Sequence, residues 1–132
     1  MMEIANLTKS KIPEKKLQCL AKRILDKEKK KGIVSIAIVG EKKMRQLNKA
    51  YCNKDYAASV LSFTDDSFAL GEIVLCPLEI RKDALKYKIP FKRAISWMFV
   101  HGLLHLLGYT HKTIKEEKIM TKKEQTYLSF IK

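Results

Sequence analysis

The most apolar part of the chain runs from Ala94 to Tyr109, and it limits the possible folds more than any other segment. Pro90 can begin a helix just before it, and Gly108 can end one. After Arg93 nearly every side chain is apolar, so a helix here would be apolar on most of its faces. Such a helix must lie at the centre of a fold, covered on most sides. The run is too short to span a bilayer.

The rest of the chain alternates irregularly between helical and extended patterns. Apolar residues spaced three and four apart predict helices, and short β-branched runs predict strands. We expect helices at residues 14–31, 41–51, 78–87 and 114–130, strands at 33–39, 59–63 and 70–76, a weaker edge strand at 2–7 and a turn at 64–67. The pattern predicts an α/β (α+β) layer structure, in which a small mixed sheet of about four strands and its helices surround a central histidine-bearing helix. A length of 132 residues without linker or repeat predicts a single domain over 1–132.

Charge is the second constraint. Lys and Arg number 27 against 14 Asp and Glu, which gives a net charge of +13. A chain this basic favours polyanionic partners such as nucleic acid, the ribosome or an anionic membrane surface, although Lys-rich faces are often only solvated. The 3 cysteines are widely spaced and form no CxxC pair, so we expect a reducing compartment. With no apparent signal peptide or membrane-spanning run, the sequence predicts a cytoplasmic protein without a membrane partner.

The 3 histidines of the chain, His101, His105 and His111, lie within one short segment. His101 and His105 are four positions apart, so on a helix they project from the same face. Gly108 would let the chain leave the helix and turn back, which would bring His111 to face the other two. Three imidazoles leave a fourth coordination position for water, the arrangement of a catalytic zinc site. The sequence therefore predicts one Zn²⁺ per chain, although Ni, Co and Fe also accept imidazoles.

The pattern H-x-x-x-H-x-x-G-x-x-H has the ligand spacing of the metzincin proteases, which predicts a zincin-like site. The metzincin mechanism needs a Glu directly after the first His, where it serves as general base. In this chain Gly102 stands at that position. Peptidase chemistry of the metzincin type is therefore not expected.

The segment His101 to His111 resembles the signature of the YbeY family of rRNA maturation endoribonucleases, H-G-x-L-H-L-x-G-[YH]-D-H. Residues 47–63 are similar, without a gap, to the family's L-N-x-x-Y-R-x-K-D-x-P-T-D-V-L-S-F, and residues 71–73 stand where the family has G-D-I. The similarity covers about residues 34–125. It implies an α/β fold with the histidine helix at its centre and a zinc site made by the three histidines.

The resemblance also implies a metal-dependent single-strand endoribonuclease acting in 16S rRNA 3′-end maturation and ribosome quality control, with rRNA and the 30S subunit as partners. Several supporting positions depart from the family pattern: Cys52 replaces an Arg thought to bind the RNA phosphate, Thr110 replaces the Asp before the last histidine, Ala57, Ala58 and Ser59 replace the family's P-T-D, and Glu72 replaces the Asp of G-D-I. Cys cannot supply the bidentate charged contact of an Arg. Two alternatives therefore stay open, a zinc-binding ribosome-assembly factor with little or no catalysis and a zinc hydrolase of another substrate class.

Two further groups of residues are candidates for the site. Glu72 lies on the strand that the zincin-like analogy places beside the metal helix, so it is a candidate catalytic residue that orients a ligand or relays a proton. Five basic residues are candidate contacts to RNA phosphates: Arg45, Lys49, Lys54, Lys92 and Arg93. Trp97, by contrast, is expected to pack in the core. Activated water would attack the phosphodiester directly or deprotonate the ribose 2′-OH, and the sequence does not choose between these steps.

Overall fold

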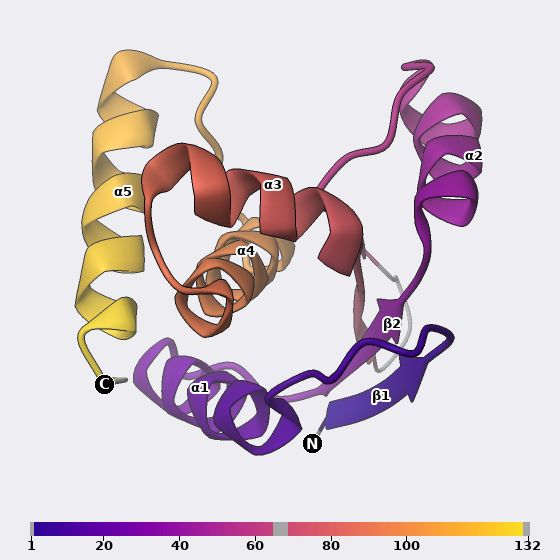
Figure 1. Cartoon of the computed structure of the whole chain (residues 1–132). Helices are drawn as coiled ribbons and strands as arrows, with labels where there is room; N and C mark the ends of the chain where they lie inside the picture. The colour runs from indigo at the N-terminus through magenta and orange to yellow at the C-terminus, as the bar shows by residue number, and fades with distance from the viewer. Residues whose placement is uncertain (1, 65–68, 131–132) are drawn as a thin grey trace.

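The computed structural model of the chain describes residues 2–64 and 69–130 (Figure 1). Its elements, in chain order, are β1 (Met2–Asn6), α1 (Glu14–Lys27), β2 (Ile33–Ile38), α2 (Glu41–Cys52), β3 (Val60–Thr64), β4 (Ala69–Leu75), α3 (Pro77–Tyr87), α4 (Phe91–Leu106) and α5 (Ile114–Leu128). Each predicted helix and strand is confirmed. The first helix ends earlier than expected, because Lys29 adopts a left-handed conformation with φ 55°. Of the turn expected at 64–67, Thr64 belongs to β3 and the rest lies outside the described residues.

In the described part of the chain the strands form one mixed sheet in the order β1-β2-β4-β3. β1, β2 and β4 run parallel, while β3 pairs antiparallel with β4 at one edge. α1 connects β1 to its parallel neighbour β2, as parallel pairing requires. Along β2, buried Val34, Ile36 and Ile38 alternate with less buried side chains, the period of an extended strand. The small mixed sheet predicted from the sequence is confirmed.

α4 lies on one face of the sheet, against β3 and β4, and is enclosed by α1, α3 and α5 (Figure 1). Its Phe99 is fully buried, as a helix with apolar residues on most faces predicts. Gly102 is on the side that faces the sheet. A Cβ atom there would lie 3.0 Å from Ile73 and 3.1 Å from both Ser62 and Val60. The glycine therefore allows the backbone of α4 to approach the strands closely.

α2 covers the opposite face of the sheet. Its Met44 packs with Val39, Val74 and Cys76 in a second, smaller buried cluster. Val74 alternates along β4 with Ile73, which faces α4, so β4 is covered on both faces. The result is a layered α/β structure with the histidine helix at its centre, in agreement with the sequence prediction.

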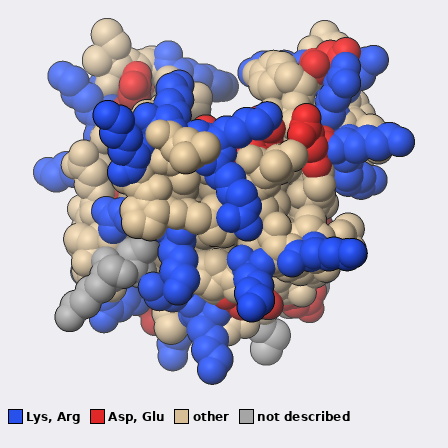
Figure 2. All heavy atoms as spheres, viewed as in Figure 1, with Lys and Arg blue, Asp and Glu red and all other residues tan. Residues whose placement is uncertain are grey.

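Basic side chains are spread over the surface in view in Figure 2, and acidic side chains are few on that face. This distribution follows from the excess of Lys and Arg in the chain. Across residues 2–64 and 69–130, the helices are all too short or too polar to cross a membrane.

Candidate metal centre

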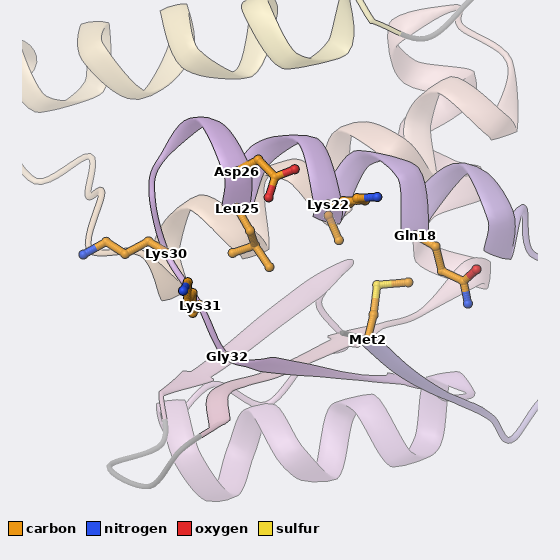
Figure 3. A pocket seen from close by; sticks show the side chains of 9 residues that line it. Met2, Gln18, Lys22, Leu25, Asp26, Lys30, Lys31 and Gly32 are labelled. Atoms are coloured by element: carbon orange, nitrogen blue, oxygen red, sulfur yellow. The ribbon is translucent and has the colours of Figure 1, made fainter.

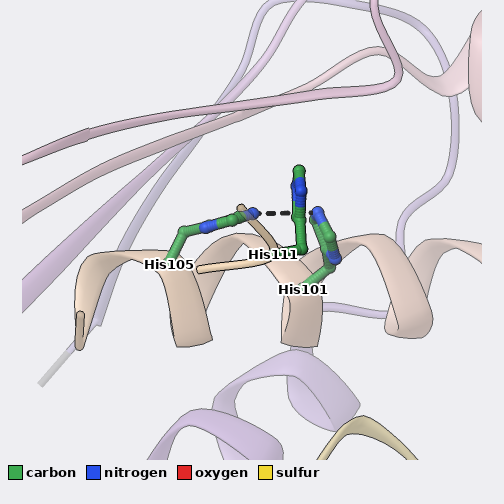
Figure 4. A group of neighbouring side chains, drawn as sticks. All are labelled: His101, His105 and His111. Carbon is green, nitrogen blue, oxygen red and sulfur yellow. Dashed lines mark hydrogen bonds between the residues drawn. The ribbon is translucent and has the colours of Figure 1, made fainter. Parts of the chain in front are cut away.

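α4 brings the first two histidines together. His101 and His105 are one helical turn apart on the same face, and both side chains are half-buried. Their ring centroids lie 4.6 Å apart, and their Nε2 atoms face each other at 3.1 Å (Figure 4). The regular helix alone therefore supplies two converging imidazole nitrogens.

The turn after α4 brings the third histidine to the same point. Gly108 has φ 102°, and its N–H donates to the carbonyl of His105 at 3.0 Å, while the N–H of Tyr109 donates to the carbonyl of Leu104 at 3.0 Å. This pair of bonds is a Schellman motif, which ends the helix and reverses the chain. His111 follows, with its ring centroid 5.0 Å from that of His105. The three ligand nitrogens lie within 4.8 Å of one another, as the histidine spacing predicted.

The outer nitrogen of each helical histidine has an acceptor as its partner. Nδ1 of His105 donates to the carbonyl oxygen of Tyr109 at 2.9 Å. Nδ1 of His101 lies 2.7 Å from Oε2 of Glu124, a carboxylate on α5. A carbonyl and a carboxylate only accept hydrogen bonds, so each Nδ1 carries the proton in the neutral ring. Each Nε2 is then left with a lone pair that points into the histidine group.

The charge state of His105 favours an unprotonated Nε2 atom. Burial is the main cause that lowers the pKa of His105, and the neighbouring His101 lowers it further. Burial also raises the pKa of Glu124, but hydrogen bonds from His101 and Trp97 outweigh it and hold that pKa below its usual value. His105 is therefore kept neutral beside an ionised Glu124.

The residues fit a metal ion by the chemistry of their donors. Imidazole lone pairs that face each other at 3.1 Å repel unless a cation lies near both. Zinc binds imidazole nitrogen at about 2.0–2.1 Å, so two of its ligands lie roughly 3.3 Å apart, close to this separation. Three nitrogen ligands suit zinc, and they also suit cobalt, nickel or iron. His101, His105 and His111 form the group of metal-ligating type found in the described residues.

Glu124 and Trp97 are parts of the site that sequence reasoning missed. The indole nitrogen of Trp97 donates to Oε1 of Glu124 at 3.0 Å, although we expected Trp97 only to pack in the core. Glu124 is separated from His101 by 23 residues, and no motif connects them. Their contact depends on how α5 packs against α4, which helical periodicity does not specify.

Glu72 lies away from the three histidines. It is exposed on β4, next to Ile73, whose side chain points to Gly102 and α4. Adjacent side chains on a strand point to opposite faces, so Glu72 points away from the histidine helix. The structure does not bring Glu72 to the histidines, and its role as a relay stays a prediction that Glu72→Gln would test by metal affinity and turnover.

A cavity of about 240 Å³ adjoins the histidines and is lined by Trp97, His101, His111, Glu117, Met120, Thr121 and Glu124. A larger cavity, about 560 Å³, lies between α1, the first residue of β1 and the segment just before β2 (Figure 3). Its lining includes Met2, Leu25 and Gly32 but none of the three histidines. The smaller cavity is therefore the one that offers space for a ligand beside the candidate metal centre.

Comparison with known proteins agrees with the site geometry. The model of the family described as Endoribonuclease YbeY matches residues 3–132. The chain belongs to the YbeY family. Endoribonuclease YbeY of Buchnera aphidicola subsp. Schizaphis graminum is 40% identical over 116 residues, which cover 83% of this chain and 73% of that protein. Endoribonuclease YbeY of Carboxydothermus hydrogenoformans is 36% identical over 137 residues, which cover 98% of this chain and 96% of that protein.

A solved structure shares the fold. The solution structure of TM1509 from Thermotoga maritima is similar to this chain with a TM-score of 0.71 and 29% identity, covering 97% of this chain and 87% of TM1509. The YbeY resemblance drawn from the histidine segment and from residues 47–63 is therefore confirmed, together with the layered fold that it implied.

The departures from the YbeY pattern leave the three histidines of the candidate metal centre in place. Cys52 is the exposed last residue of α2. The hydroxyl of Ser59 is hydrogen-bonded to the carboxylate of Asp83 on α3, which ties the segment before β3 to that helix. Thr110 is half-buried in the turn before the last histidine. Cys76, which could have added a sulfur ligand, is instead buried beneath α2.

Two of the five basic candidates have partners within the fold. Arg45 forms an exposed ion pair with Asp55 at 2.8 Å. Arg93 donates to the carbonyl of Leu128 at 3.0 Å and so binds the end of α5. The other three candidates are exposed, and they are Lys49, Lys54 and Lys92. Contact of any of the five with RNA stays a prediction.

Proposed function

We propose that this chain is a metal-dependent, single-strand endoribonuclease that acts in 16S rRNA 3′-end maturation and ribosome quality control. The observation that carries the proposal is the convergence of three histidine nitrogens within 4.8 Å in a member of the YbeY family. Zinc is the metal that we propose, one per chain, and rRNA within the 30S subunit is the proposed partner. The cytoplasm, where ribosomal subunits are assembled, is the proposed location.

His101, His105 and His111 would hold the metal through their Nε2 or Nδ1 atoms. When bound, the metal supplies Lewis acidity, which polarises a phosphate oxygen and lowers the pKa of water towards about 7. The protein leaves Nε2 of His105 free for the metal, because the carbonyl of Tyr109 holds the ring proton on Nδ1, away from the metal side. Gly102 faces the sheet, so α4 supplies no carboxylate directly after the first ligand.

Charge supports an RNA substrate. The net charge of +13 favours binding to a phosphate backbone, and Lys49, Lys54 and Lys92 are exposed and able to contact it. Arg45 would have to exchange its partner Asp55 for a phosphate, and that ion pair is exposed to solvent. Exposed ion pairs contribute little to stability because water and salt screen them, so the exchange is not prevented.

Single-turnover cleavage of an end-labelled, single-stranded RNA by the zinc-loaded protein tests the proposal. Chelator-treated protein and His105→Ala would run beside it, together with His111→Ala, whose exposed side chain contributes little to folding. A duplex of the same sequence controls for strand preference. We expect cuts in the single strand that disappear in all three protein controls. A protein that binds one zinc per chain and cuts no RNA would overturn the ribonuclease proposal.

A further inference from the structure

Glu124 reaches the metal centre from α5 and joins Trp97 to His101. Its Oε2 lies 2.7 Å from Nδ1 of His101, and its Oε1 accepts a hydrogen bond from the indole nitrogen of Trp97 at 3.0 Å. Trp97 and His101 are four positions apart on α4, so both face α5. The carboxyl side chain is only 12% exposed. Each of its two oxygens therefore has a specific partner in a setting with little water.

We propose that Glu124 fixes the tautomer of His101, so that Nδ1 carries the proton and Nε2 stays free to bind the metal, and that Trp97 determines which atom of the residue at position 124 faces His101. Glu124 is a positioning residue, because it acts through His101 and is not among the three metal-ligating side chains. The inference rests on the metal site of the proposed function, and it does not depend on RNA cleavage.

The donors and acceptors around Glu124 permit one arrangement. An indole N–H can only donate, and an ionised carboxylate can only accept. Glu124 therefore accepts from Trp97 with one oxygen and from His101 with the other. Because a neutral imidazole carries a single N–H, a proton held on Nδ1 leaves Nε2 with the lone pair that a metal requires.

An amide at position 124 would break this arrangement because it has one acceptor and one donor group. If its oxygen accepted from Trp97, its NH₂ would face Nδ1 of His101, which would then have to accept. The imidazole proton would move to Nε2, where it blocks the metal. If the amide turned over, its NH₂ would face the indole N–H, and two donors would meet. Trp97 thus determines which way a Gln at this position points.

A tautomer effect can be distinguished from a loss of charge or of helix packing. Phe at position 97 keeps an aromatic ring but has no N–H. In the W97F/E124Q double variant the amide oxygen is free to turn to His101 and to accept its Nδ1 proton. Removing a second hydrogen-bonding group should therefore restore what E124Q removes, which neither lost charge nor weaker packing between α4 and α5 predicts.

Zinc affinity, measured by competition with a chromophoric chelator, is the first test. We expect E124Q to bind zinc about 10–100-fold more weakly than wild type, the usual effect of losing a partner of a metal ligand. W97F should bind as wild type does, because the carboxylate still accepts from His101. The double variant should recover most of the loss. Glu116→Gln, on the same helix, removes the same charge from a residue that does not line this cavity, and is the matched control.

The ¹⁵N resonances of His101 in metal-free protein are the second test, at about pH 8, where an ordinary imidazole is neutral. Signals are assigned by their loss in His101→Gln. We expect the proton on Nδ1 in wild type and in the double variant, and on Nε2 in E124Q.

Three results would overturn the inference: Nε2–H in wild type, unchanged zinc affinity in E124Q, or a double variant that binds as weakly as E124Q. A wild-type chain that binds no zinc would instead overturn the proposed function, and the resonance test would still decide the tautomer.

Discussion

Removing the hydroxyl of Tyr127 should weaken the whole fold, because it is one of three donors to a single buried carboxylate. Glu28, just after α1, accepts from the Tyr109 hydroxyl at 2.5 Å, from Nζ of Lys123 at 3.0 Å and from the hydroxyl of Tyr127. Its side chain is only 10% exposed. The cluster connects the end of α1 to α5 and to the turn that carries His111. Tyr127→Phe deletes one donor and keeps the buried ring.

The structure sets the size of the effect. A hydrogen bond to a charged group is worth about 1.5–3 kcal/mol, and the Phe ring leaves no cavity. Because two donors remain, we expect Tyr127→Phe to lower the free energy of unfolding by about 2 kcal/mol. For a chain of this length that corresponds to a drop in Tm of about 6–8 °C. Tyr56→Phe removes the same atom from an exposed side chain and should cost no more than about 0.5 kcal/mol.

The free energy of unfolding lost in Tyr127→Phe should be larger at neutral pH than in acid. Burial raises the pKa of Glu28, but hydrogen bonds from Tyr109, Tyr127 and Lys123 lower it more, so the folded pKa lies below its ordinary value. A depressed carboxyl pKa contributes stability that is present above the unfolded pKa, about 4.3, and is lost as pH falls through the folded pKa. The cost of Tyr127→Phe should therefore shrink in acid.

Urea unfolding of both variants, followed by the fluorescence of Trp97, the only tryptophan of the chain, measures this cost. The measurement is made at about pH 7 and then at decreasing pH, as far as wild type still unfolds cooperatively. A variant within about 0.5 kcal/mol of wild type at neutral pH would refute the reasoning. A cost that stays constant into acid would also refute it, because Glu28 would then not be the partner that matters.

Four further outcomes can be measured. Gly102→Leu should abolish cooperative unfolding in urea, because the side chain would enter the sheet, where even a Cβ meets neighbours at 3.0–3.1 Å. Thr113→Ala should cost about 1 kcal/mol in the same assay, because the Thr113 hydroxyl caps α5 by accepting from a backbone N–H. Lys49→Ala and Lys92→Ala should each reduce the salt dependence of RNA binding by about one unit of slope, and an unchanged slope would exclude a phosphate contact. Cys52→Arg should strengthen RNA binding about tenfold, measured by filter binding, if the family Arg position faces the phosphate.

The sequence predicted those parts of the molecule that depend on local spacing. α4 was predicted because its apolar residues cover most faces, which demands a central position. The convergence of the three histidines was predicted because His101 and His105 are one helical turn apart and Gly108 is suited to reverse the chain before His111. Each of these relations lies within one short segment, so helix geometry was enough.

The parts that the sequence did not reveal join distant segments. Glu124 lies 23 residues from His101, and Glu28 lies 81 residues from Tyr109 and 99 from Tyr127. All are ordinary helix or turn residues in a chain rich in charged side chains. Which carboxylates become buried depends on how α1 and α5 pack around α4, and this packing is not encoded in the spacing of any one helix.

The rotation of α4 explains why metzincin ligand spacing occurs here without metzincin chemistry. Successive helical residues are about 100° apart, so the residue after His101 points away from the metal side. In this fold that direction leads into the sheet, where Gly102 meets Ile73, Ser62 and Val60. Position 102 is thus fixed by packing and has no room for a general base. Glu124, the carboxylate nearest to His101, has both oxygens occupied by donors. A general base for the proposed cleavage would therefore come neither from position 102 nor from a free oxygen of Glu124.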